Sequence, residues 1–226
     1  MSAGDLQSLW LTLRLAGVVT GLLLLIATPL AWWLAHSRAR LVPVVEALTA
    51  LPLVLPPTVI GFYMLVAFAP GSLVGGLWLR LTGHGLGFSF AGLVVASLFY
   101  SLPFAVQPLQ AGFVQMGRAP LEAAASLGAA PWDAFLSVTL PLSLRAYLTA
   151  GVLTFAHTMG EFGVVLMVGG NIPGQTRVIS VALYEAVEGL DYGAAHRLAG
   201  LLMVLSFAVL LGLYGLNAQT GRGRAK

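Results

Sequence analysis

The feature that most constrains the fold of this chain is the length of its apolar stretches. Several runs of about 20 residues or more contain no Asp, Glu, Lys or Arg, and only 8% of all residues are charged. A transmembrane helix needs about 20 consecutive apolar residues, whereas a soluble domain carries about 25% charged residues. This pattern excludes a soluble enzyme domain and a disordered segment. We predict an all-α, polytopic integral membrane protein.

The apolar runs predict five transmembrane helices and a single transmembrane domain covering residues 1–226. The spans lie at about residues 12–36, 48–69, 88–114, 141–168 and 197–217. Between the second and third spans, residues 71–76 read as a turn and residues 83–87 as a loop. After the fourth span, residues 178–187 are expected to form a short helix near the membrane interface. Irregular structure is therefore predicted only between the spans, apart from the prolines described next.

Two spans contain residues that a membrane helix rarely tolerates. Pro52, Pro56 and Pro57 remove three backbone donors, so the second span is expected to be kinked or to start irregularly. Glu161 lies inside the fourth apolar run, and an ionisable residue within the membrane indicates a functional site. Because a carboxylate repels an anion, we expect Glu161 to act structurally, capping a helix or pairing with an Arg or a backbone donor.

Lys and Arg are distributed unevenly over the predicted loops. With the N-terminus outside, the inner segments carry Arg38, Arg40, Arg118, Arg222, Arg224 and Lys226. The positive-inside rule therefore predicts an outer N-terminus and a cytoplasmic C-terminus. Eleven Lys and Arg against eight Asp and Glu are too few and too scattered for a nucleic-acid-binding surface. We expect no nucleic-acid partner.

The chain lacks the residues that common cofactors and catalytic sites require. It has no Cys, and its only Lys is the last residue, Lys226, so it cannot form a phosphate-binding P-loop. We predict no catalytic residue, no metal site and no cofactor. His157 lies four residues before Glu161, so the two could share a helical face. Two readings stay open for this pair: a proton relay, or a polar contact between helices.

The longest inner segment, residues 117–141, is not built like a flexible linker. Pro120 suits the first turn of a helix, the residues up to Leu127 favour helix, and Gly128 stands where a left-handed C-cap is expected. A second short turn is expected after Pro131. Because so short a helix is marginal in water, this segment must pack against something.

The spacing within this segment resembles the EAA loop of type I ABC-transporter permeases. The matching pattern is Glu122-Ala-Ala, three residues, Gly128, nine residues, and Val-x-Leu-Pro ending at Pro141. The resemblance implies the type I ABC permease fold and a loop that docks on a cytoplasmic ATP-binding ABC subunit. The coupling residues it implies are Leu121, Glu122, Ala123, Ala124, Leu127, Gly128, Leu140 and Pro141.

A narrower resemblance is to the molybdate permease family. It is carried by the segments 51–63 (Leu-Pro-Leu-Val-Leu-Pro-Pro-Thr-Val-Ile-Gly-Phe-Tyr), 160–163 (Gly-Glu-Phe-Gly) and 171–176 (Asn-Ile-Pro-Gly-Gln-Thr). Residues implied in the translocation path or its structure are Pro56, Pro57, Thr58, Gly160, Glu161, Gly163, Asn171 and Pro173. The resemblance implies a homodimer in the lipid of a bacterial inner membrane, supplied by a periplasmic or extracellular molybdate-binding protein.

Other functions remain open at this point. Sulfate and thiosulfate permeases resemble the chain at residues 160–163, and tungstate is close to molybdate in size and charge. A proton-coupled secondary transporter using His157 and Glu161 is a more distant alternative, and it would need inverted repeats that are not visible.

Overall fold

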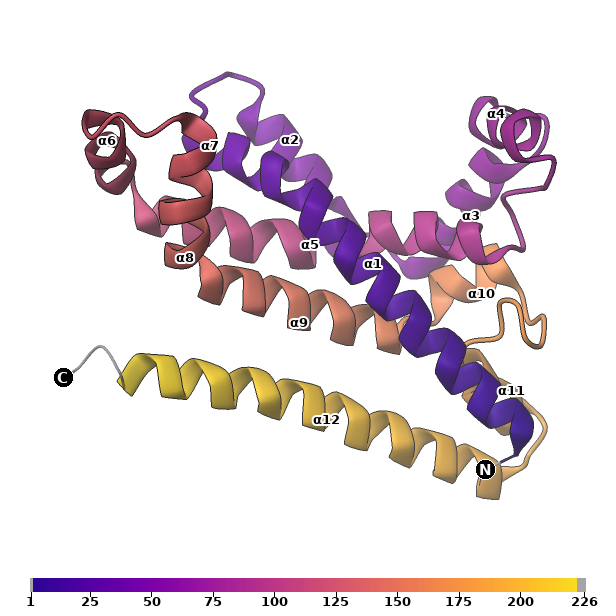
Figure 1. Ribbon diagram of the computed structural model, residues 1–226. Helices are drawn as coiled ribbons and strands as arrows, with labels where there is room; N and C mark the ends of the chain where they lie inside the picture. Colours follow the sequence, from indigo (N-terminus) through magenta and orange to yellow (C-terminus); the bar gives the residue numbers. More distant parts are fainter. Residues whose placement is uncertain (1, 223–226) are drawn as a thin grey trace.

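Three long helices dominate the computed structural model, which describes residues 2–222 and the side chains of residues 2–215. They are α1 (Ala3–His36), α5 (Phe90–Met116) and α12 (Tyr192–Arg222) (Figure 1). Each is long and apolar enough to span a membrane. They coincide with the first, third and fifth predicted spans, and no strand occurs within residues 2–222. α1 begins earlier than predicted because Ser2 and Asp5 form a capping box at its start.

The core lies between α1, α5 and α9 (Leu144–Gly160), which pack against one another. The buried positions of α1 include Leu15, Val19, Leu23 and Ala27, a spacing of four residues that keeps them on one face. α5 and α9 approach most closely at Gly112, where an added Cβ would lie 2.4 Å from the Cβ of Ala146. A small residue is therefore required at this crossing.

The second predicted span is broken, as its prolines indicate. It consists of α2 (Val42–Ala50), the short 3-10 helix η1 (Leu51–Leu53) and α3 (Pro57–Phe68). The two halves meet at an angle of 108°. Pro56 is extended, with φ −55° and ψ 137°, and Pro57 begins α3. The bend follows because Pro57 has no N–H to continue the first helix.

The fourth predicted span, 141–168, is wrong as a single helix. The chain passes through α7 (Pro131–Ala134), the π-helical turn η2 (Phe135–Thr139) and α8 (Leu140–Leu142), and it bends by 70° before α9. α9 then ends at Gly160, and α10 (Gly163–Gly169) starts after a break at residues 161–162. The described structure thus has three unbroken candidate spans, and up to five if each bent pair is one span.

Two shorter helices complete the fold. Residues 71–76 were predicted as a turn, but Ser72 caps a helix, α4 (Leu73–Thr82), by accepting a hydrogen bond from the Gly75 N–H. The predicted short helix at 178–187 is present as α11 (Ile179–Glu188). Thr12 on α1 accepts a hydrogen bond from the Ile179 N–H at 2.9 Å, which fixes the start of α11 against α1.

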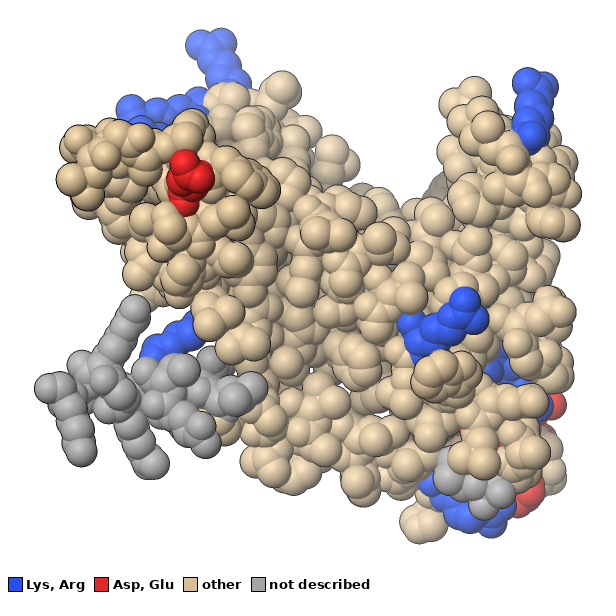
Figure 2. Space-filling model, in the orientation of Figure 1, with Lys and Arg blue, Asp and Glu red and all other residues tan. Residues whose placement is uncertain are grey.

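The long helices run side by side, so the molecule has two ends. Figure 1 shows α6 (Ala119–Ser126) and α7 at one end and the start of α1 with α11 at the other. α1 starts and α12 finishes at opposite ends, as an odd number of spans requires. Figure 2 shows no charged side chain over the middle of α1 and α9 on this face, where a membrane interior would lie.

Candidate functional site

The loop at residues 117–141 contains the helix that the sequence predicts. Gly117 ends α5 with φ +68°, and α6 follows with Pro120 in its first turn. At its other end the Gly128 N–H donates to the Ala125 carbonyl and the Ala129 N–H to the Ala124 carbonyl, both at 3.0 Å. This is a Schellman closure, and Gly128 takes the left-handed conformation that it requires, with φ +84°.

The outer surface of this loop is apolar and exposed. Leu127 is 88% exposed and Trp132 68% exposed. Ala124 is buried, Leu121 is half-buried, and Glu122 and Ala123 are exposed. The loop therefore exposes large apolar side chains at its end of the bundle.

Two contacts hold the loop against the bundle, and a third lies within the loop. Arg118 Nη2 donates to the His36 carbonyl at the end of α1 over 3.0 Å. The ring of Phe135 meets Trp32 of α1 edge to face, with 6.2 Å between centroids, and stacks on Trp132. These contacts supply the packing that so short a helix needs. The loop and α1 are therefore expected to move together.

The last two predicted coupling residues lie further from the exposed surface. Leu140 is half-buried and lines an apolar groove of about 1060 Å³ beside α1, while Pro141 is exposed. Both residues join the loop to α9, and Leu140 shares the groove with Trp132. Their position indicates a hinge between loop and helix.

At the opposite side of the bundle, the Pro-Pro segment and the Gly-Glu-Phe-Gly segment meet. A Cβ added to Gly163 would lie 2.8 Å from the Cβ of Pro57. One turn further along, a Cβ on Gly61 would lie 2.6 Å from the Cβ of Met167. α3 and α10 therefore cross at van der Waals contact because glycine occupies both crossing points.

A cavity of about 580 Å³ opens beside this crossing. Its lining comprises Pro57, Thr58, Tyr100, Ala156, His157, Gly160, Glu161, Phe162 and Gly163.

 Five of the eight predicted path residues line the cavity, namely Pro57, Thr58, Gly160, Glu161 and Gly163, whereas Pro56, Asn171 and Pro173 do not. The structure thus brings together residues from two of the three segments that the sequence singled out.

Glu161 lies in the break between α9 and α10 and is 4% exposed. Its Oε2 accepts a hydrogen bond from the Ser97 hydroxyl of α5 at 2.7 Å, while Oε1 has no partner among the described residues. Its main-chain carbonyl accepts a hydrogen bond from the Ser180 hydroxyl of α11 at 2.6 Å. The structural role expected for Glu161 stays a prediction, and its partners in the structure are serines and not an Arg or a backbone donor.

His157 lines the same cavity but uses different partners. Its Nδ1 lies 2.9 Å from the Ser101 hydroxyl, which lies 3.0 Å from the Thr158 hydroxyl. The imidazole stacks on Phe104, with 4.0 Å between ring centroids. His157 and Glu161 are each bonded to a separate serine of α5, so the direct pairing expected from a shared helical face is not seen in the structure.

The third segment forms a turn outside the cavity. Asn171 and Pro173 are exposed, and the turn is closed by the buried Thr176, whose hydroxyl donates to the Gly169 carbonyl at 2.6 Å. Arg177 forms a salt bridge with Glu185 of α11, with 2.6 Å between Nη2 and Oε2. This segment therefore connects α10 to α11 and does not line the cavity.

Sequence reasoning missed the serines that hold Glu161. Ser97 and Ser101 are four residues apart in an apolar helix, so they share a face, and this pattern could have indicated a polar contact. Ser180 carries no such pattern, since its partner is a carbonyl brought near by the fold.

Comparison with known proteins places the chain in a family. Residues 27–219 match the family model described as "Binding-protein-dependent transport system inner membrane component". The chain belongs to this family. It is therefore a multi-pass permease of the inner membrane, as the apolar helices also indicate.

Several curated relatives match over most of this permease. It is 54% identical over 214 residues to the molybdenum transport system permease protein ModB of Azotobacter vinelandii, covering 95% of each chain. It is 39% identical over 206 residues to the protein of the same name from Mycobacterium tuberculosis, covering 91% of this chain and 77% of the relative. It is 34% identical over 194 residues to the sulfate transport system permease protein CysT of Escherichia coli, covering 85% of this chain and 69% of the relative.

Solved structures confirm the fold of this permease. A bacterial ABC transporter that imports alginate matches with a TM-score of 0.75 at 16% identity, covering 97% of this chain and 80% of the other. The MetNI methionine ABC transporter matches with a TM-score of 0.70 at 18% identity, covering 96% of this chain and 97% of the other. The predicted ABC permease fold is thus confirmed.

Proposed function

We propose that this permease forms the translocation path of an ATP-driven importer for molybdate. The assignment of molybdate as the substrate rests on the 54% identity, over 95% of both chains, to a molybdenum transport permease. Tungstate has the same shape and charge and is expected to share the path. The 34% identity to a sulfate permease makes sulfate the second candidate.

ATP hydrolysis is assigned to a separate ATP-binding subunit. The chain has no P-loop lysine, and its loop offers the exposed side chains of Leu127 and Trp132 to a partner. Because one chain carries one such loop, two copies would be needed to engage two ATPase subunits. The proposal therefore includes a homodimer, with a periplasmic or extracellular binding protein delivering the oxyanion.

The proposed orientation puts the loop in the cytoplasm and the N-terminus outside. Arg38, Arg40 and Arg118 lie near the loop end of the bundle, which agrees with the positive-inside rule. The cavity beside Glu161 then lies toward the outer half of the path. A bare dianion cannot cross hydrocarbon, and the bent helices α3 and α9 are the irregular elements that a protected path permits.

Movement would pass from the loop to the cavity through α9. The loop is bonded to α1 at His36 and joined to α9 through Leu140 and Pro141. α9 ends at Glu161, beside the cavity. Closure of the ATPases would draw the loops together and open the path outward, as a rocking motion between discrete states.

The test is uptake by proteoliposomes containing the chain and the subunits that copurify with it. We expect ATP enclosed in the lumen, on the side of the loop, to drive accumulation of radioactive molybdate that the binding protein delivers from outside. An ionophore that collapses the proton gradient should leave this uptake unchanged. Uptake that requires the proton gradient and ignores ATP would overturn the proposal and favour a proton-coupled transporter. Uptake of sulfate in preference to molybdate would overturn the assignment of molybdate as the substrate.

A further inference from the structure

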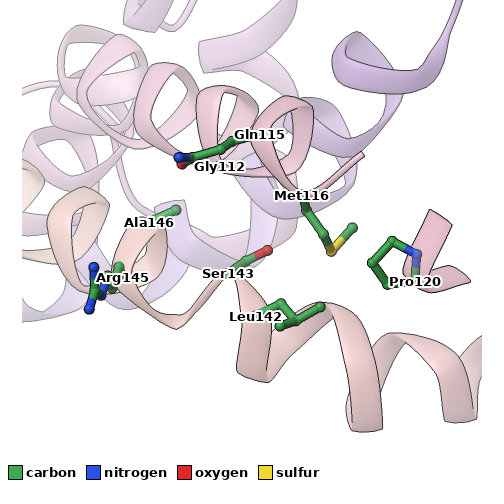
Figure 3. A pocket seen from close by; sticks show the side chains of 8 residues that line it. All are labelled: Gly112, Gln115, Met116, Pro120, Leu142, Ser143, Arg145 and Ala146. Carbon is green, nitrogen blue, oxygen red and sulfur yellow. The ribbon is translucent and has the colours of Figure 1, made fainter. Parts of the chain in front are cut away.

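A pocket of about 390 Å³ lies where the end of α5, the start of α6 and the start of α9 meet. Figure 3 shows the eight side chains that line it: Gly112, Gln115, Met116, Pro120, Leu142, Ser143, Arg145 and Ala146. The lining contains one cationic group and no carboxylate. Since one water takes up about 30 Å³ in the liquid, the pocket has room for a small hydrated anion.

Ser143 is a buried polar group without a partner in this pocket. It is 2% exposed, and its hydroxyl makes no hydrogen bond with any described residue. In Figure 3 its oxygen points from the start of α9 toward Met116, into the space that the lining residues surround. An unsatisfied buried hydroxyl is unfavourable, so a ligand that accepts a hydrogen bond from it would remove that cost.

The pocket also lies at the N-terminus of a long helix. Ser143 is the N-cap of α9, which has 17 residues, and its side chain makes no capping hydrogen bond. The first N–H groups of a helix have no acceptor within it, and the helix dipole adds positive potential there. These groups favour an anion.

Arg145 adds a full positive charge at the rim. It is exposed, and it forms no salt bridge with the residues whose side chains the structure describes. Its guanidinium points away from Ser143 in Figure 3, and the residue lines the same pocket. The Gln115 amide lines the same pocket from α5 and can donate a further hydrogen bond.

We propose that this pocket binds a tetrahedral oxyanion at the coupling-loop end of the permease. Ser143 and the first turn of α9 would donate hydrogen bonds, and Arg145 would supply the charge. The identification of the ligand with the transported oxyanion rests on the proposed function. The phosphate of an anionic lipid offers the same chemistry, so the test separates the two sources.

The experiment measures binding of radioactive molybdate by equilibrium dialysis. The purified complex is placed in nanodiscs of phosphatidylcholine alone or with phosphatidylglycerol, without the binding protein. We expect saturable binding that weakens about tenfold in Arg145→Gln and several-fold in Ser143→Ala. The control is Arg80→Gln on α4, at the far end of the bundle, which removes the same charge and should bind like wild type.

The two lipid conditions identify the source of the oxyanion. Equal molybdate binding in both supports the free ion, and loss of binding with phosphatidylglycerol supports a lipid phosphate in the same pocket. Equal molybdate binding by wild type and Arg145→Gln in both lipids would overturn the proposed site. Uptake is measured in parallel with the same purified complex reconstituted into proteoliposomes together with the binding protein. Active uptake without binding in the nanodiscs rejects the pocket alone, whereas absent uptake rejects the proposed function.

Discussion

Pro57 and Gly163 lie in contact although they come from opposite halves of the chain. A Cβ on Gly163 would lie only 2.8 Å from the Cβ of Pro57, closer than two carbon atoms can pack without a shift. The contact joins the bend of the second span to the break of the fourth, and both residues line the cavity beside Glu161. The two irregular points of the membrane domain are thus one structural unit.

Gly163→Ala is expected to destabilise the protein. The added methyl group must displace Pro57, whose ring is rigid, and overpacking of this kind costs about 1–3 kcal/mol. Thermal unfolding in detergent should show a lower midpoint. Gly160→Ala is the control, because no atom lies within 4 Å of its added Cβ. Equal midpoints for the two variants would show that α3 and α10 do not cross as described.

Ser97→Ala is expected to destabilise the protein by about 1–3 kcal/mol, because it leaves the buried Glu161 carboxyl without its hydrogen-bond donor. Glu161→Gln should lower the free energy of unfolding by less in the Ser97→Ala background than in wild type, because the Ser97–Glu161 hydrogen bond is already absent there. A double-mutant cycle from unfolding free energies measures the coupling. Ser126→Ala, on the exposed surface of α6, is the control. Additive effects of the two core substitutions would contradict the contact.

Gly128→Ala is expected to loosen the coupling loop. Gly128 has φ +84°, and a side chain in this region costs about 1 kcal/mol or more. Amide hydrogen exchange across residues 119–129 should accelerate, and Gly128→Asn should show a smaller effect because Asn tolerates this conformation. Gly71→Ala is the control, since its Cβ would meet open space without a positive φ. Unchanged exchange in Gly128→Ala would count against the Schellman closure.

The loop helix was predictable because its signals are local. Pro120 favours a helix start and Gly128 a left-handed end, and both act within a few residues of themselves. The bend at Pro56 and Pro57 was predictable for the same reason, since a missing N–H interrupts a helix wherever it occurs. The long apolar runs gave α1, α5 and α12 because crossing a membrane depends mainly on length and hydropathy.

The break at Glu161 was not predictable from the sequence around it. Residues 141–168 read as one apolar run, and the groups that stabilise the interruption, Ser97 and Ser180, come from other helices. The helix α4 was missed because glycines at 71–76 favour a turn, and the cap from Ser72 outweighs them. His157 and Glu161 do not pair directly because α9 ends before Glu161, and each forms its polar contact with a serine of α5.

Purification of the tagged chain from its native membrane tests whether the loop binds an ATPase. We expect an ATP-binding subunit to copurify with wild type and to fall about tenfold in Leu127→Ser, because this exposed side chain would lie at the centre of the contact. Leu73→Ser on α4 is the control, with a side chain that is 90% exposed at the other end of the bundle. An ATPase retained equally by both variants, or absent from wild type, would contradict the coupling role of the loop.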